Sequence, residues 1–530
     1  MSRSQSKDHP YFPPFEVHPY SIEVLVEILA DRSEASRLDI QSKLHCMYLK
    51  DYFLSPEINA QTILVENNYI DRDYVEDFAE YYVRCFRHYR KKCTRVHFFD
   101  NLFSSEDFES VLRGDNQELA EALRKDHYLG FIVIKPLPET IIGRTCLKTY
   151  GNDSGRRNYL GVTPYKASLF GLDLEIDTLA FQEQDSVLAA CATSALWSIF
   201  QVTGKIFQHS IPSPSVITKS AAKYAPMDNR YFPNTGLTAF QIASAVRSLG
   251  LEPSKVQPGD SFIFKSTLYA YLRSGLPVLF GIELWDTSTL KDSLLGLHAV
   301  AVTGYSLGIQ EAILEDPTDI LLKATRIDKI YVHDDQVGPF ARMDLELQNI
   351  NGKERFCLST SWKDSNGTLN GVKAVPHIFV IPLYHKIRIP FENVLAAVRS
   401  IVFILDTPFR KYSLYPKGLI WDIHLICAND IKREILASNS LSKDQKNKTL
   451  LQELPRFIWR AKALHDNAPV IDLLFDATDI EQASFLTYAI NYDDLLFEIL
   501  KYLSCQDWLI DHPEYRSAKK IFDWFSSQED

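Results

Sequence analysis

The length of the chain is the first constraint on its fold. One hydrophobic core rarely serves more than about 250–300 residues, so a chain of 530 residues is expected to form two to four domains. Hydrophobic residues make up 46% of the sequence and charged residues 24%, and both values are ordinary for globular proteins. The sequence therefore predicts a globular, multidomain protein rather than a fibrous or disordered one.

Changes in local pattern divide the chain into three regions. Residues 1–155 mix strand-like runs such as TILVENNYI with helical spacing and end at the loop YGNDSGRRN. Residues 156–390 contain strand-like runs such as LPVLFGIEL and HAVAVTGYS together with apolar helical segments. Residues 391–530 begin with the helical FENVLAAVRSIVFIL and continue with the strand-like GLIWDIHLICAND. We expect α+β structure, with an N-terminal α+β region, a central domain and a C-terminal α/β region at these boundaries.

Several local patterns predict individual elements. Residues 71–89 have the aromatic spacing of a long helix, capped by Asp71 or Asp73. A second helix is predicted within residues 234–253, with Thr238 as its cap. The runs ERFCLSTSW and HIFVIPLYHKIRI flank the turn KDSNGT as the strands of a hairpin would, and APVIDLLFDATD is expected to be a strand that leads into a helix.

The charge and the apolar runs exclude several classes of partner. The formal charge of −11 argues against nucleic-acid binding, and the aromatic and basic residues of DRDYVEDFAEYYVRCFRHYRKKC recur at helical spacing, which favours packing. No apolar run approaches the roughly 18–20 residues of a membrane helix, and the first residues lack the apolar stretch of a signal peptide. The eight cysteines show no Cys-x-x-Cys pair, which favours a reducing compartment. We expect a cytoplasmic protein with no membrane or nucleic-acid partner, whose oligomeric state the sequence leaves open.

The common cofactor motifs are missing from the sequence. It contains no Gly-x-Ser-x-Gly, no phosphate-binding loop, no Gly-x-Gly-x-x-Gly and no His-Glu-x-x-His. The histidines do not cluster at metal-ligand spacing, and a helix cap explains Asp476 and Asp479 in FDATDIEQ better than a metal does. We therefore predict neither a cofactor nor a metal.

A cysteine, a histidine and an acid instead stand where thiol catalysis needs them. Cys191 opens the apolar helical run CATSALWSIF, and a helix N-terminus or a nearby imidazolium lowers the pKa of a thiol. His298 begins the apolar strand HAVAVTGY, and Asp334 closes the strand IYVHDD. Gln184, upstream of the cysteine, could donate to an oxyanion. His333 would point to the opposite face of its strand, so we expect it to be structural.

These residues resemble a known family in their order and setting. A Gln before a Cys-led apolar helix, then GLTAFQIASAVRSLGL, HAVAVTGY and YVHDD, is similar to the papain-like fold, and in particular to the C39-like cysteine peptidases. The resemblance covers roughly residues 165–385. It implies a papain-like central domain in which Cys191 is the nucleophile, His298 the general base, Asp334 the orienting acid and Gln184 the oxyanion donor.

The resemblance leaves two site residues open, the oxyanion donor and the orienting acid. The family's glutamine usually lies six residues before the cysteine and Gln184 lies seven before it, so Gln182 is an alternative. The family's acid also follows its histidine more closely, which makes Asp316 in EDPT a competitor of Asp334, and Asp335 is the choice if the register differs by one residue.

The leading functional hypothesis is a cysteine hydrolase that acts on a protein or peptide, as a peptidase or an isopeptidase. An acyltransferase, transglutaminase-like or deamidating enzyme could use the same triad. The third hypothesis is an interaction or scaffold protein whose papain-like domain is inert.

Overall fold

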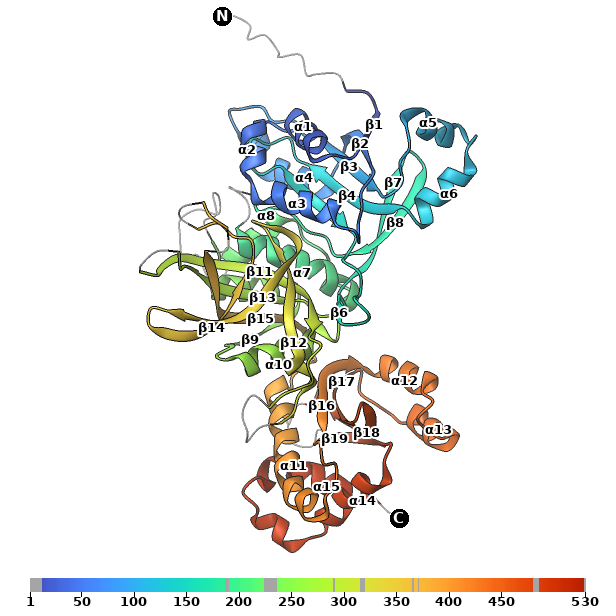
Figure 1. Cartoon of the computed structure of the whole chain (residues 1–530), viewed down its shortest axis with the longest axis vertical. Helices are drawn as coiled ribbons and strands as arrows, with labels where there is room; N and C mark the ends of the chain where they lie inside the picture. The colour runs from blue at the N-terminus through green and yellow to red at the C-terminus, as the bar shows by residue number, and fades with distance from the viewer. Residues whose placement is uncertain are drawn as a thin grey trace, which may run out of the picture.

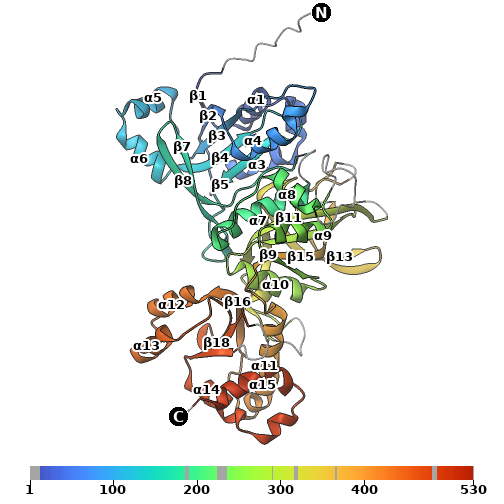
Figure 2. The same cartoon turned by 180° about the vertical axis from the view of Figure 1, so that it is seen from behind.

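The computed structural model describes residues 12–185, 190–223, 236–288, 291–314, 320–364, 367–369, 371–479 and 486–528. Within these residues the strands form sheets of five, eight and four strands and one two-stranded hairpin. The three larger sheets follow one another along the long axis of the molecule, in sequence order (Figure 1), and the view from behind shows the same succession (Figure 2). The expected mixture of helices and sheets is confirmed. In the described part of the chain, no helix combines the length and the apolar character needed to cross a membrane.

The N-terminal sheet is antiparallel and has helices on both faces. Its strands, in spatial order, are β1 (Phe15–Pro19), β2 (Thr62–Tyr69), β3 (Cys93–Phe99), β4 (Tyr128–Ile134) and β5 (Ile142–Leu147). Apolar residues of one face pack against α1 (Ile22–Arg32) and α3 (Leu44–Leu54), which α2 (Arg37–Ser42) connects. The other face packs against α4 (Arg72–Glu80), α5 (Ser105–Arg113) and α6 (Gln117–Lys125). Because α3 lies at the end of this region nearest the central sheet, it can reach the site described below.

The long helix predicted over residues 71–89 is wrong in its length. Asp71 does cap α4, since its side chain accepts a hydrogen bond of 2.9 Å from the backbone N–H of Tyr74. The helix ends at Glu80, and a short 3-10 helix follows at Tyr82–Arg84. The Tyr82 hydroxyl donates a hydrogen bond of 2.6 Å to Asp185. This contact between distant parts of the sequence accompanies the break in the helix.

A hairpin connects the N-terminal and central regions. It consists of β7 (Thr163–Leu169) and β8 (Leu172–Thr178), with Phe170 and Gly171 at positive φ in the turn. β8 packs against α6, β4 and β5. The hairpin therefore lies with the N-terminal sheet in space, although the sequence boundary places it after residue 155.

The central sheet contains a closed ring of strands. β10 (Val278–Asp286) pairs with both its sequence neighbour and the last strand of the sheet, so six antiparallel strands complete the ring. The other five are β11 (Ser293–Leu307), β12 (Ile327–Asp334), β13 (Gly338–Ile350), β14 (Lys353–Ser359) and β15 (Val372–Tyr384). β9 (Leu251–Val256) adds to β15, and β6 (Arg157–Asn158) adds to β11. The sheet therefore has one continuous set of strands on which helices can pack.

Four helices accompany the central sheet: α7 (Cys191–Phe207), α8 (Pro214–Ala222), α9 (Ala239–Ser248) and α10 (Ser261–Leu272). α7 packs against β10, β11 and β12. Thr238 caps α9 as predicted, and Gln241 completes a capping box with it. The predicted hairpin of residues 354–362 and 377–389 is largely wrong, because β14 pairs with β13 along its whole length and with β15 only at Leu358 and Ala374.

The C-terminal sheet is antiparallel, with the order β16 (Ile420–Cys427), β17 (Phe457–His465), β18 (Ala468–Asp476) and β19 (Leu486–Asn491). Its helices are α11 (Phe391–Tyr412), α12 (Ala428–Ala437), α13 (Lys443–Leu451), α14 (Asp494–Ser504) and α15 (Tyr515–Ser526). Residues 477–479, where a helix was expected to begin, form no helix, and Asp476 instead accepts a hydrogen bond of 2.7 Å from the N–H of Thr478.

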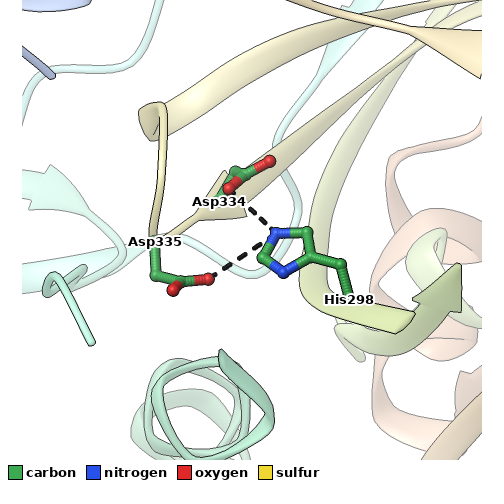
Figure 3. A group of neighbouring side chains, drawn as sticks. All are labelled: His298, Asp334 and Asp335. Atoms are coloured by element: carbon green, nitrogen blue, oxygen red, sulfur yellow. Dashed lines mark hydrogen bonds and ion pairs between the residues drawn. The ribbon is translucent and has the colours of Figure 1, made fainter. Parts of the chain in front are cut away.

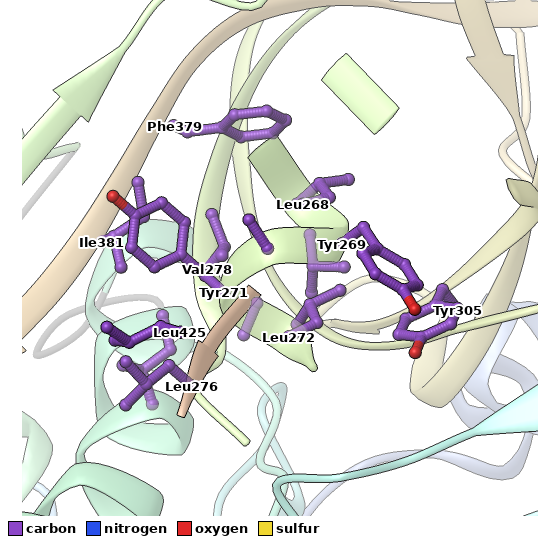
Figure 4. Close-up of a cluster of buried hydrophobic side chains, with 14 of the residues drawn as sticks. Leu268, Tyr269, Tyr271, Leu272, Leu276, Val278, Tyr305, Phe379, Ile381 and Leu425 are labelled. Atoms are coloured by element: carbon purple, nitrogen blue, oxygen red, sulfur yellow. The ribbon is translucent and has the colours of Figure 1, made fainter. Parts of the chain in front are cut away.

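A shared apolar core joins the central and C-terminal regions. Side chains of α10, β15 and β16 pack together there, among them Tyr271, Ile381 and Leu425 (Figure 4). Beside this core the hydroxyl of Tyr269 donates a hydrogen bond of 3.0 Å to Asp422. The C-terminal region is thus packed onto the central one through buried contacts.

Candidate active site

Cys191 is the first residue of α7. It is partly exposed, whereas most of the helix that follows it is buried. The N–H groups of a first helical turn have no partner within the helix, so this end carries partial positive charge. Negative charge is favoured at such a helix end.

The antiparallel register brings His298 and Asp334 together. On β11 and β12, Ala301 pairs with His333, so Asp334 lies diagonally across from His298 at the end of its strand. Nε2 of His298 lies 3.1 Å from Oδ1 of Asp334 and donates a hydrogen bond to it (Figure 3). Both side chains are buried. The two residues therefore form a fixed imidazole–carboxylate pair.

Two further groups orient Asp334. The indole N–H of Trp362 donates a hydrogen bond of 2.9 Å to Oδ2, and the backbone N–H of Gln336 donates one of 2.9 Å to Oδ1. With His298, these donors use both oxygens of the carboxylate. Sequence reasoning missed Trp362 and Gln336, although a tryptophan at the end of ERFCLSTSW was a signal that a buried N–H donor follows the strand.

Asp335 places a second carboxylate against the same ring nitrogen. Its Oδ1 lies 3.7 Å from Nε2 of His298, and its side chain is also buried (Figure 3). Neither oxygen of Asp335 accepts a hydrogen bond from another residue in the described part of the chain. A register irregularity between Val332 and Asp334, followed by the turn at 335–337, turns both acids toward His298 instead of to opposite faces. Both of these acids therefore approach the ring, and Asp334 is the one that accepts a hydrogen bond from it.

The charges of this cluster shift its pKa values in opposite directions. Burial alone would lower the pKa of His298, but the charges of Asp334 and Asp335, the hydrogen bond with Asp334 and the nearby side chain of Cys191 raise it well above its usual value. Burial would raise the pKa of Asp334, but the charge and hydrogen bond of His298 lower it. Burial and the charge of Asp334 raise the pKa of Asp335 to about 7.

The side chain of Cys191 lies near enough to the ring of His298 to contribute to its raised pKa. Since Nε2 faces the two carboxylates, Nδ1 is the nitrogen that remains for the thiol. The three groups thus follow one another in space in the order thiol (Cys191), imidazole (His298) and carboxylate (Asp334). This arrangement can move a proton from sulfur to the ring and hold the resulting imidazolium.

The glutamines lie in the segment that leads toward Cys191. Gln182 is buried, and its Nε2 has no hydrogen-bond partner among the described residues; Gln184 is half-buried. Both residues proposed for the oxyanion role therefore lie in this segment. The third acid considered from the sequence, Asp316, falls outside the described residues.

The start of α3, in the N-terminal region, also contacts the cluster. The ring of His45 is buried near the backbone of Asp335, and burial lowers its pKa. Lys43 forms an ion pair with Glu183, whose other oxygen accepts a hydrogen bond of 3.1 Å from the N–H of Ile142. Nothing in the sequence linked these residues to Cys191, because their proximity depends on how two separately folded regions pack.

His333 lies apart from this arrangement, as expected. It packs edge-on against Phe181 and Phe340, and its Nδ1 lies 3.5 Å from the hydroxyl of Ser198. Burial lowers its pKa to about 3, so it is neutral in the folded protein. Its setting is that of a core residue.

The same cluster also contains three side chains of the kinds that bind metal ions. Among the described residues, His298, Asp334 and Asp335 are the only group of three such side chains, with ligand atoms all within 4.8 Å of one another. The N–H of Nε2 already joins His298 to Asp334, so the pair is satisfied without a cation.

A cavity of about 380 Å³ opens beside the cluster, and His298, Gln336 and Trp362 form part of its wall. It gives a ligand access to a ring that is otherwise buried. No protein-family model matches the chain, and no curated protein is significantly similar to it in sequence.

Proposed function

We propose that the protein is a cysteine-dependent hydrolase, a peptidase or isopeptidase of the papain-like, C39-like type. The observation that carries this proposal is the setting of the His298 ring, which donates a hydrogen bond from Nε2 to Asp334 and also interacts with the side chain of Cys191. The position of Cys191 at the start of α7 and the packing of this helix on the ring of strands also support it.

The reaction follows from this geometry. His298 takes the proton of the Cys191 thiol, and the sulfur attacks the carbonyl carbon of an amide. The oxyanion that forms is stabilised by the backbone N–H of Cys191 and by the amide of Gln184 or Gln182. His298 then gives its proton to the leaving nitrogen as the C–N bond breaks. Water, activated by the neutral ring, hydrolyses the thioester and frees the acid.

The remaining proposals concern setting and partners. The substrate is a protein or peptide, and the acidic chain acts in the cytoplasm without nucleic acid or a membrane as partner. The triad needs no cofactor, because both proton donor and nucleophile are side chains.

Site-specific alkylation of the thiols tests the proposal. We expect iodoacetamide at neutral pH to modify Cys191 at least about tenfold faster than Cys505, which is an exposed thiol outside the site. The variant His298→Ala should abolish this difference. His377→Ala is the matched control, because His377 is a half-exposed histidine on β15 of the same sheet.

Peptide hydrolysis should follow the same pattern, with loss of turnover in Cys191→Ala and His298→Ala. Equal alkylation of Cys191 and Cys505, unchanged in His298→Ala, would mean that the domain is an inert scaffold. Fast alkylation combined with transfer of the acyl group to added amines would identify a transferase.

A further inference from the structure

The cavity beside His298 has a mostly apolar wall. Its polar side chains are those of His298, Gln336 and Lys363. The apolar lining residues come from the central sheet, the segment after β14 and the N-terminal helix α3, and they are Leu44, Leu284, Leu295, Leu297, Trp362 and Val372. A volume of about 380 Å³ lies within the range of roughly 300–1,000 Å³ that is usual for ligand pockets. The cavity can therefore enclose one large apolar side chain.

Two of these leucines are exposed next to the proposed general base. Leu295 is 47% and Leu297 69% exposed, whereas His298 is only 3% exposed. In the pairing of β10 with β11, Leu284 lies opposite Gly296 and Trp285 opposite Leu294, so Leu295 is an extra, bulged residue. Bulges of this kind redirect side chains near active sites. Here the bulge lies beside the wall of the cavity.

The first half of β11 also has an open edge. β11 pairs with β10 from Ser293 to Val302 but with β12 only from Ala301 onward. Among the described strands, none pairs with residues 293–300 on the side away from β10. Extended peptides bind open strand edges through main-chain hydrogen bonds, with alternate side chains entering pockets.

The position of the cavity relative to the triad indicates which part of a substrate it holds. His298 lines the cavity, and the described lining residues do not include Cys191. In the proposed reaction His298 donates its proton to the leaving nitrogen. The leaving group must therefore lie against the ring of His298, which forms part of the cavity wall.

We propose that this cavity is the leaving-group subsite, which selects polypeptides with a large apolar residue directly after the scissile bond. The substrate lies extended along the open edge of β11, and Leu295, Leu297 and Leu44 contact the apolar side chain. The subsite rests on the proposed hydrolase function. It deepens that function, because it names a substrate class that the triad alone does not define.

Cleavage of a peptide library tests this subsite. The full-length protein is incubated with peptides from a digested proteome, and the new N-termini are identified by mass spectrometry. We expect Leu, Ile, Met or Phe as the first residue of most new N-termini. Because one methylene in an apolar pocket changes selectivity by about 10–200-fold, a leucine peptide should exceed its glycine analogue in kcat/KM by at least about tenfold.

A pair of leucine variants assigns the effect to the cavity. Leu297→Asp should lower kcat/KM for the leucine peptide by at least about tenfold and raise the share of Lys and Arg at that position. Leu347→Asp, at an exposed leucine on β13 that is absent from the cavity wall, should leave the preference unchanged. Melting temperatures of both variants should stay close to that of the unaltered protein, because both leucines are exposed.

The alkylation rate of Cys191 separates the two proposals. If Cys191 is activated by His298 but the new N-termini show no apolar preference, or no new N-termini form, the subsite proposal is wrong. An unaltered preference in Leu297→Asp also contradicts it. If Cys191 is not activated, the hydrolase proposal itself fails.

Discussion

Asp335 Oδ1 lies 3.7 Å from Nε2 of His298, although Asp334 already accepts a hydrogen bond from that nitrogen. Two buried carboxylates therefore share one imidazole. Asp334 has its full set of donors, whereas neither oxygen of Asp335 accepts a hydrogen bond from another described residue. The two acids thus have different roles: Asp334 holds the ring in place, and Asp335 acts on it through charge.

The first prediction concerns the pH dependence of Cys191. Burial and the charge of Asp334 raise the pKa of Asp335 to about 7, so this carboxyl loses its proton as the pH rises through neutrality. Its negative charge then favours the imidazolium of His298 and with it the thiolate of Cys191. We expect the alkylation rate of Cys191 to show an extra rise of about threefold to tenfold between about pH 6 and about pH 8.

The variant Asp335→Asn should remove this extra rise and keep the fast reaction that depends on His298. The exposed thiol of Cys505, followed in the same samples, supplies the profile of an ordinary thiol. Identical pH profiles for Cys191 in the unaltered protein and in Asp335→Asn would show that Asp335 does not act on the ring.

The second prediction concerns Asp334. Replacing an orienting aspartate by asparagine leaves the geometry but favours the wrong tautomer of the histidine, which lowers kcat by up to about 10⁴ in serine proteases. We expect Asp334→Asn to lower kcat for peptide hydrolysis by about 10²–10⁴. The control is Asp344→Asn, at an exposed aspartate on β13 that pairs with Lys329, and it should retain normal turnover. A loss of less than tenfold in Asp334→Asn would exclude an orienting role.

The site residues that the sequence could predict are those at the ends of strands. His298 and Asp334 were expected because a polar residue at the end of an apolar strand projects from the edge of a sheet, and the register does bring them together. The position of Cys191 at the start of a helix followed from a local pattern in the same way.

Contacts between regions could not be predicted. His45 and Lys43 reach the cluster only because α3 packs at the boundary with the central region, and no local pattern encodes that packing. The pairing of β14 with β13 was missed for a related reason. Apolar spacing identifies a strand but not the strand with which it pairs. The short turn at Asn351 and Gly352 indicates the pairing of β13 with β14 better than the longer KDSNGT indicates a pairing of β14 with β15.

The third prediction concerns the ion pair between Lys43 and Glu183. The charge of Glu183 raises the pKa of Asp335, and Lys43 compensates part of this charge. In Lys43→Ala the negative charge of Glu183 acts on Asp335 without its partner. We expect the extra rise in the alkylation of Cys191 to move to higher pH. Lys50→Ala, at an exposed lysine on the same helix, is the control and should keep the profile. A shift to lower pH in Lys43→Ala would contradict this electrostatic account.

The fourth prediction concerns stability and depends on Asp77 in α4. Its Oδ1 accepts a hydrogen bond of 3.1 Å from the N–H of Ser215, and burial raises its pKa to about 8. A carboxyl with a higher pKa in the folded than in the unfolded state binds more protons when folded, so the folded protein loses stability as the pH rises from about 4 to about 8. Asparagine keeps the acceptor and carries no charge.

We therefore expect Asp77→Asn to raise the melting temperature at about pH 8.5 by a few degrees and to change it little at about pH 5, where Asp77 itself is protonated. Thermal unfolding followed by circular dichroism at both pH values measures this, with Asp115→Asn at an exposed aspartate as control. A lower melting temperature at the higher pH would mean that the charged carboxylate stabilises the fold. In that case its bond to Ser215 N–H would outweigh the cost of burying the charge between α4 and α8.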